Sequence, residues 1–286
     1  MGTKKDTDLA KKEQNALATA MDFSQFGGTG FEDTGKDDYA IPFLNIIQAN
    51  SPQVDEAKAD FDAEAKKGEI FNSVTGERFD GKTGIIFQPV FREHNFIEYV
   101  PRDNGGGFVG VHAIDSDIVA KAKAESTEFG KYKTPAYDKE GKATGGMNEL
   151  VETFSVYGNL LDETGEEFIC QAIISFTSTK IKVYKKMMTS LNTFMLPTPD
   201  GGKAQVPMFA NRLRITTGTQ VNKGQTSYNF HVAPMNGSLK ESVLAPDSAL
   251  IRLGYEFHNL VKDGAVNVDR SQAQEPSGPA RDDAPF

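Results

Sequence analysis

The stretch from Glu149 to Leu196 constrains the fold most, because its hydrophobic pattern changes from the period of strands to that of a helix. Apolar and polar residues alternate around Phe154 and again from Phe168 to Phe176, with the turn-like segment Asp162–Gly165 between them. Such alternation is typical of strands with one buried face. We therefore predict an antiparallel hairpin in this region.

A short helix is predicted to follow the hairpin, from Ser178 to about Leu191. Its apolar residues recur at helical spacing on one arc: Ile181, Tyr184, Met188 and Leu191. Its lysines fall on the opposite arc: Lys182, Lys185 and Lys186. One side of this helix should pack on the sheet, whereas the other should present cations to solvent.

The remaining patterns extend this unit into a mainly β protein with a few helices, of the α+β class. Further strands are indicated at about 84–91, 96–100, 209–218 and 225–232, and a last helix at about 246–261. We predict one core, from residue 38 to residue 262. A flexible arm of residues 1–37 precedes it. A disordered tail of residues 263–286 follows, because its polar and charged residues bury too little apolar surface to fold.

The composition bears on whether the protein is membrane-bound and on which cellular compartment it occupies. The sequence has no apolar run long enough to cross a bilayer, so no membrane partner is expected. Its single cysteine, Cys170, cannot form an internal disulfide and falls on the buried face of a predicted strand. We therefore expect a reduced, cytoplasmic location.

One segment matches an enzyme motif. Gly76–Thr83 has the pattern of the phosphate-binding loop of nucleotide hydrolases. That loop needs a helix directly after it, whose amide groups face the phosphates. Gly84, Ile85 and Ile86 follow instead and favour a strand. We interpret the segment as a hairpin turn and keep a nucleotide hydrolase as a remote alternative.

No other pattern indicates catalysis. The 4 histidines are isolated, without a second ligand at a metal-binding spacing. We therefore predict no catalytic residue, no metal and no cofactor, and a protein that is not an enzyme.

The charges are unevenly distributed along the chain. The net charge of −9 argues against a general polyanion binder. The stretch from Ser178 to Lys223 is nevertheless basic, with Asp200 as its acidic residue. Its candidate phosphate-binding residues are Lys180, Lys182, Lys185, Lys186, Arg212, Arg214 and Lys223. Arg212 and Arg214 are two apart on a predicted strand and share a face, so they could line one groove with the lysines.

Aromatic residues lie on neighbouring β segments. Phe96, Tyr99, Phe108 and Tyr157 are the candidates for stacking on bases. Cations for phosphates and flat rings for bases are what a protein that binds single-stranded nucleic acid requires. The alternative is a solvated helix face above a core rich in phenylalanine.

The carboxyl terminus ends the predicted tail with Asp282, Asp283, Ala284, Pro285 and Phe286. A tethered tip of this kind can place its phenylalanine in a pocket and its carboxylates on basic residues of a partner. It resembles the acidic tip of bacterial single-stranded DNA-binding proteins, which ends in Asp-Asp-Ile-Pro-Phe and recruits replication and repair enzymes. Ala284 departs from that pattern at the isoleucine. The resemblance implies partner binding by Asp282, Asp283, Pro285 and Phe286.

The body of the chain is more similar to bacteriophage single-stranded DNA-binding proteins, which place an OB-type barrel before an acidic tail. Ile41–Leu44 and Gly105–Gly110 carry this likeness. It implies an OB-fold-like antiparallel barrel with insertions, and location in the host cytoplasm. In that architecture the helix from Ser178 to Leu191 connects the third and fourth strands.

The expected function is therefore to bind and protect single-stranded DNA during phage replication or recombination, and to recruit partner enzymes through the tip. The tail is also expected to compete with DNA for the basic groove. An annealing or recombination-mediator protein remains an alternative, and so does a phage scaffolding protein. Homo-oligomers are compatible with each of these.

Overall fold

The computed structural model describes residues 29–30, 39–222 and 225–273. The chain divides into a unit of Met1–Tyr39 and a unit of Ala40–Phe286. The fold below is that of the second unit. The predicted arm of residues 1–37 therefore lies almost wholly outside the described residues.

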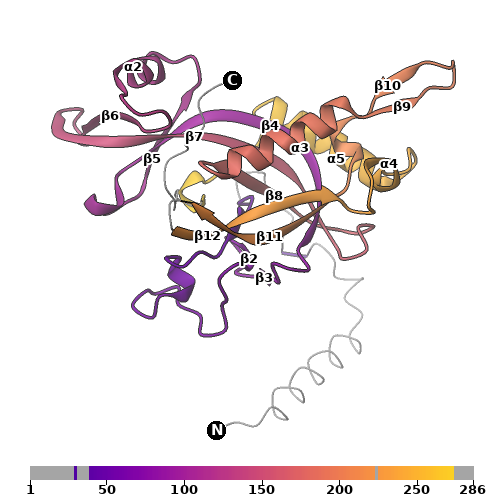
Figure 1. Cartoon of the computed structure of the whole chain (residues 1–286), viewed down its shortest axis with the longest axis horizontal. Coiled ribbons are helices and arrows are strands. Elements are labelled where there is room, and N and C mark those ends of the chain that lie inside the picture. Colours follow the sequence, from indigo (N-terminus) through magenta and orange to yellow (C-terminus); the bar gives the residue numbers. More distant parts are fainter. Residues whose placement is uncertain (1–28, 31–38, 223–224, 274–286) are drawn as a thin grey trace, which may run out of the picture. The chain divides into compact units, whose positions relative to one another are not determined.

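A seven-stranded antiparallel sheet forms the centre of the fold (Figure 1). Its strand order is β12-β11-β4-β7-β6, with β5 paired to β4 and β8 paired to β7. The strands are β4 (Ile85–Tyr99), β5 (Phe108–Ala113), β6 (Tyr132–Tyr137), β7 (Ala143–Leu161), β8 (Phe168–Thr177), β11 (Leu213–Asn222) and β12 (Gln225–Pro234). β7 and β8 are the predicted hairpin, with Phe154 opposite Phe176, so that prediction is confirmed.

Two small sheets and four helices complete the described part. β1 (Leu44–Ile46), β2 (Ile70–Asn72) and β3 (Arg78–Phe79) form one sheet, and β9 (Met195–Pro197) and β10 (Lys203–Gln205) form the other. The helices are α2 (Asp117–Glu125), α3 (Lys180–Thr193), α4 (Leu239–Ser242) and α5 (Ala249–Lys262). Short 3-10 turns are η3 (Pro52–Val54), η4 (Arg102–Asn104), η5 (Met208–Ala210) and η6 (Arg270–Gln272). The predicted class, mainly β with a few helices, is confirmed.

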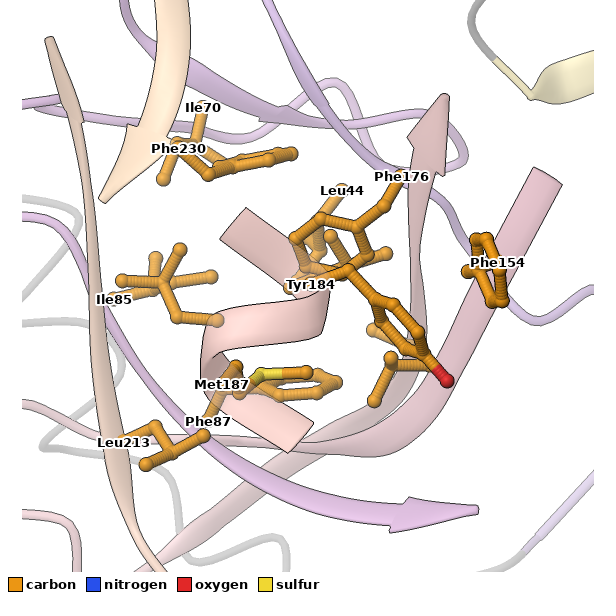
Figure 2. Close-up of a cluster of buried hydrophobic side chains, with 14 of the residues drawn as sticks. Leu44, Ile70, Ile85, Phe87, Phe154, Phe176, Tyr184, Met187, Leu213 and Phe230 are labelled. Carbon is orange, nitrogen blue, oxygen red and sulfur yellow. The ribbon is translucent and has the colours of Figure 1, made fainter. Parts of the chain in front are cut away.

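The largest hydrophobic core lies between the sheet and α3 (Figure 2). Side chains of α3 such as Tyr184 and Met187 pack there against Phe87, Phe154 and Phe176. Both α3 and β1 contact the two outer strands β8 and β12. No ladder between described residues joins β8 to β12, so the sheet is open and is not a closed barrel. The helix and the small sheet fill the gap that a barrel closes with hydrogen bonds.

The packed chain continues past residue 262, where the core was predicted to end. Val266, Val268 and Ala273 pack in a second cluster with Tyr157. Arg270 is 9% exposed, and its guanidinium contacts Glu93 and the Tyr157 hydroxyl. The predicted end of the core was wrong because these few apolar residues and one buried ion pair are enough to hold the segment on the sheet.

The segment Gly76–Thr83 contains β3 and the turn that leads from it into β4. The Asp80 carboxylate accepts hydrogen bonds from the backbone N–H groups of Lys82 and Thr83, each at 2.9 Å. Gly84 follows with a φ of 71°, and a Cβ there would collide with the backbone of Ile215. β4 then begins at Ile85, and no helix follows, so the turn interpretation is confirmed.

Candidate nucleic-acid interface

The basic helix predicted from the sequence is α3. Its buried side consists of Ile181, Tyr184, Met187 and Leu191. The side chains of Lys182, Lys185 and Lys186 are exposed on the other side. Because the helix turns by 100° per residue, the buried and charged residues separate onto opposite faces. The sequence prediction of a helix with one packed and one cationic side is confirmed.

Lys180 differs from the other lysines of this helix. It is half-buried, and its Nζ lies 5.4 Å from the centroid of the Phe230 ring. Burial lowers its pKa to about 8. A lysine with this environment carries its charge less readily than an exposed one, so it is a weaker candidate for phosphate binding than Lys182, Lys185 and Lys186.

The basic helix lies in a segment almost without carboxylates. Between Phe168 and Lys240 the only acidic residue of the sequence is Asp200. α3 therefore has no intrahelical acid at the (i, i+4) positions that usually neutralise surface lysines. No carboxylate within α3 itself therefore offsets the charges of its lysines, in a chain whose net charge is −9.

Arg212 does not take part in this surface. It is 7% exposed, and its Nη1 donates to the carbonyl of Gly165 at 3.1 Å and to Glu166 Oε1 at 2.5 Å. Its Nε donates to the carbonyl of Ser242 at 3.3 Å. The guanidinium thus joins the β7–β8 turn to α4. Its assignment to phosphate binding was wrong because the side chain is buried and paired.

Arg214 also points away from α3. Its neighbours Leu213 and Ile215 point into the core that α3 covers, so Arg214 projects from the other side of β11. Its Nη1 donates to the carbonyl of Thr83 at 3.2 Å. The expected convergence of Arg212 and Arg214 with the lysines of α3 was therefore wrong. Lys223 lies outside the described residues.

Most of the proposed stacking residues are buried. Phe96 is 0% exposed, Tyr99 4% and Tyr157 3%, whereas Phe108 is 37% exposed. Phe96 packs under α2, and the Tyr157 hydroxyl donates to Glu93 at 2.9 Å. Burial raises the pKa of Tyr157 above its usual value. Buried rings cannot stack on bases, so of these four residues only Phe108 remains a candidate.

A different set of residues lies beside α3 on the same face of the sheet. Arg92, His94 and Phe96 alternate on β4 and share that face. The His94 ring stacks on Phe154 at 3.9 Å, and Phe154 stacks on Tyr184 of α3 at 4.4 Å. This row of rings runs from Tyr184 of α3 to Phe96 of β4, where α2 covers the sheet. The period-two pattern of β4 was the signal that could have located it.

Two further cations border the row of rings. Arg92 is exposed beside Tyr184, where it opposes the rise in the pKa of that tyrosine that burial causes. Lys123 of α2 places its Nζ 4.6 Å from the centroid of the Phe96 ring. The cationic surface on this side of the sheet therefore consists of the outer face of α3 with Arg92 and Lys123, and we refer to it as the α3 surface.

Carboxylates lie between these cations as well. His94 Nε2 is 3.1 Å from Glu152 Oε1, and His112 Nε2 is 2.7 Å from Glu98 Oε2. Asn148 also donates to Glu98, at 2.6 Å. The carboxylates of Glu152 and Glu98 are thus each held by a histidine ring on this face of the sheet.

The other features considered from the sequence are the carboxyl-terminal tip, a metal site and a membrane span. The tip residues Asp282, Asp283, Pro285 and Phe286 lie outside the described residues. Within the described ranges, no group of three His, Cys, Asp or Glu side chains is arranged to hold a metal ion. Across the same part of the chain, no helix is long and apolar enough to span a membrane.

Comparison with known proteins gives a match to a protein family. A protein-family model described as "Pam3 phage gp34-like protein" matches residues 11–267. This range includes every named helix and strand from β1 to α5. No curated protein and no solved structure matches the chain.

Proposed function

The chain belongs to the Pam3 phage gp34-like family, and from that premise we propose that it binds single-stranded DNA during phage replication or recombination. The observation that supports this most is the outer face of α3. Lys182, Lys185 and Lys186 are exposed there together, in a segment where Asp200 is the only acid between Phe168 and Lys240.

Phosphate contacts would supply most of the affinity. Each lysine that neutralises a phosphate releases a condensed counterion, so binding weakens as salt is raised. Arg92 and Lys123 extend the cationic surface on the same side of the sheet. Because the row of rings beside them is largely buried, stacking would contribute less than in proteins with open aromatic platforms. Binding should therefore depend little on base sequence.

The carboxyl-terminal tip is assigned to partner recruitment on its sequence. Asp282 and Asp283 precede Pro285 and Phe286 at the end of the chain. Carboxylates followed by a terminal apolar residue suit a partner pocket that is bordered by arginine or lysine. The same acidic segment would also compete with DNA for the lysines of α3.

A binding titration tests the main proposal. Affinity for a poly-dT oligonucleotide and for duplex DNA would be measured across a salt series, with the full chain and with the variant Lys182→Glu/Lys185→Glu/Lys186→Glu. We expect the full chain to prefer poly-dT and the variant to lose about 2 units of the salt slope, since each single-strand phosphate contact contributes about 0.7.

A matched control has the same change in net charge elsewhere. Lys58, Lys66 and Lys67 are exposed and lie in the segment that precedes β2 in the chain. Their triple replacement by glutamate should leave the salt slope unchanged. If both triple variants weaken binding equally, general charge and not the α3 surface is responsible, and the proposed interface is wrong. Failure of the full chain to bind poly-dT would refute the function itself.

To test whether the tail competes with DNA, the chain should be truncated after Ala273. A cut before Asp269 would also remove Arg270, whose guanidinium is bound to Glu93, and would disturb the core. The chain ending at Ala273 keeps that contact and loses only the acidic tail. We expect it to bind poly-dT more tightly than the full chain at low salt. Equal or weaker binding would show that the tail does not compete.

A further inference from the structure

An apolar groove runs along the first half of α5, on the side of the molecule defined by η5 and β8. Its volume is about 1060 Å³. The apolar part of its lining includes the aromatic rings of Phe168, Phe209 and Tyr255 and the side chain of Leu253. Phe168 is 43% exposed and Tyr255 is 54% exposed. We call this hollow the α5 groove. Large rings left open to solvent around one hollow indicate a binding surface.

The charges around the α5 groove leave one carboxylate available. Arg252 Nε is 3.4 Å from Glu256 Oε1, and Glu166 is paired with Arg212. Asp247, which also lines the groove, has no ion pair with any described residue. An occupant should therefore bring an apolar side chain for the rings and one cation for Asp247.

The β9–β10 hairpin has these properties. Figure 1 shows it projecting away from the sheet and the helices that surround it. All three residues of β10 are exposed, and Met195 of β9 is 51% exposed. Lys203 is its cation. A methionine thioether packs favourably against aromatic rings, and an ammonium pairs with a carboxylate.

The hairpin also lacks the support that a two-stranded sheet requires. β9 and β10 pair with each other and, within the described residues, with no third strand. Hairpins of this size are marginally stable in water unless they pack against something else. An exposed hairpin with an apolar side chain is thus best explained by a surface that covers it in an assembly.

We propose that a second copy of this chain supplies that surface, and that the β9–β10 hairpin of each copy docks in the α5 groove of the other. The hairpin and the groove are adjacent in the chain, because Phe209 of the groove wall follows β10 by only a few residues. A hairpin that leaves one edge of the groove and points away can be exchanged reciprocally about a two-fold axis. Such an interface is closed and produces a dimer.

This dimer would bring two basic helices together. α3 leads directly into β9, so the carboxyl end of α3 lies at the base of the exchanged hairpin. Two copies joined there would present two lysine faces to the same nucleic acid, which raises the apparent affinity without any new contact. That consequence depends on the proposed function, whereas the dimer itself does not.

Sedimentation of the full chain without DNA tests the dimer. The monomer mass is 31.2 kDa. We expect the measured mass to reach twice that value as the protein concentration is raised to about 100 µM. Met195→Asp and Tyr255→Asp should each weaken association by at least about 100-fold, since each places a charge against an apolar surface. Val221→Asp is the matched control, because Val221 is 70% exposed and lies outside both surfaces, and it should associate as the wild type does.

A charge exchange tests the orientation of the contact. Lys203→Asp and Asp247→Lys should each weaken association by about 10-fold, because a like-charge pair replaces an attractive pair twice in the dimer. The double variant Lys203→Asp/Asp247→Lys should recover most of this loss. A chain that is monomeric throughout, or a dimer that none of these variants weakens, overturns the proposal. A dimer that fails to bind poly-dT would count against the proposed function and leave the assembly intact.

Discussion

Gln88 offers the sharpest test of the physical reasoning about the fold. It is 0% exposed, and its Nε2 donates to the carbonyls of Phe209 at 2.6 Å and Leu250 at 2.9 Å. Its Oε1 accepts from Asn159 Nδ2 at 2.7 Å. One amide thus joins β4 to its neighbour β7, to η5 and to α5, and it positions two walls of the α5 groove.

The substitution Gln88→Leu keeps nearly the same shape and removes every hydrogen bond. Asn159 is 0% exposed, so its amide group would lose its partner without gaining water. A buried polar group without a partner costs about 1–3 kcal/mol, and the two carbonyls add to that cost. We expect a loss of about 3–5 kcal/mol in the free energy of unfolding. The measurement is urea-induced unfolding with linear extrapolation.

Two controls separate hydrogen bonding from packing. Thr219→Val changes an exposed hydroxyl on β11 and should alter stability by less than about 0.5 kcal/mol. In the double variant Gln88→Leu/Asn159→Leu the orphaned amide is gone, so its loss should be smaller than the sum of the single losses by about 1–2 kcal/mol. A loss below about 1 kcal/mol for Gln88→Leu would refute the reasoning, because it would mean that the buried amide network contributes little.

Three further perturbations follow from the packing. Gly158→Ala should destabilise the fold by about 2 kcal/mol or more, because the added Cβ would overlap a phenylalanine ring and the backbone of β4. Gly218→Ala is the control, because Gly218 has open space around it. Equal urea midpoints for the two variants would contradict this prediction. Arg270→Ala should cost about 1–3 kcal/mol by leaving Glu93 without its cation, and adding Glu93→Gln should recover part of that loss in the same assay. Because burial lowers the pKa of Lys180 from 10.5 to about 8, the unfolded chain binds more protons between these values, so stability should rise with pH in that window. Lys180→Met should remove this part of the rise in stability. The measurement compares the urea midpoints of the wild type and the variant at about pH 8 and about pH 10, and an equal change in both proteins would disprove the prediction.

The alternation of residues along the chain determined the local structure of this protein. The β7–β8 hairpin and α3 follow from hydrophobic periods of two and 3.6 residues, which depend only on near neighbours. The turn at Gly76–Thr83 was predicted for the same reason, since Gly84 and two β-branched residues cannot begin a helix well. The lysine side of α3 could also be read directly, because opposite faces of one helix are fixed by spacing alone.

Only the tertiary structure decided which of the candidate residues share a surface. From the sequence, Arg212 and Phe96 could have been exposed binding residues, because arginine and phenylalanine at these positions also fit a nucleic-acid surface. In the structure, Arg212 is bound to Glu166 and Phe96 lies beneath α2. Their burial depends on elements far away in the chain that no local period reveals. The row from Arg92 to Tyr184 was missed for the same reason, because β4 and α3 meet only when the sheet curves around the helix. Local period thus sets which side of an element is apolar, whereas long-range packing sets what covers it.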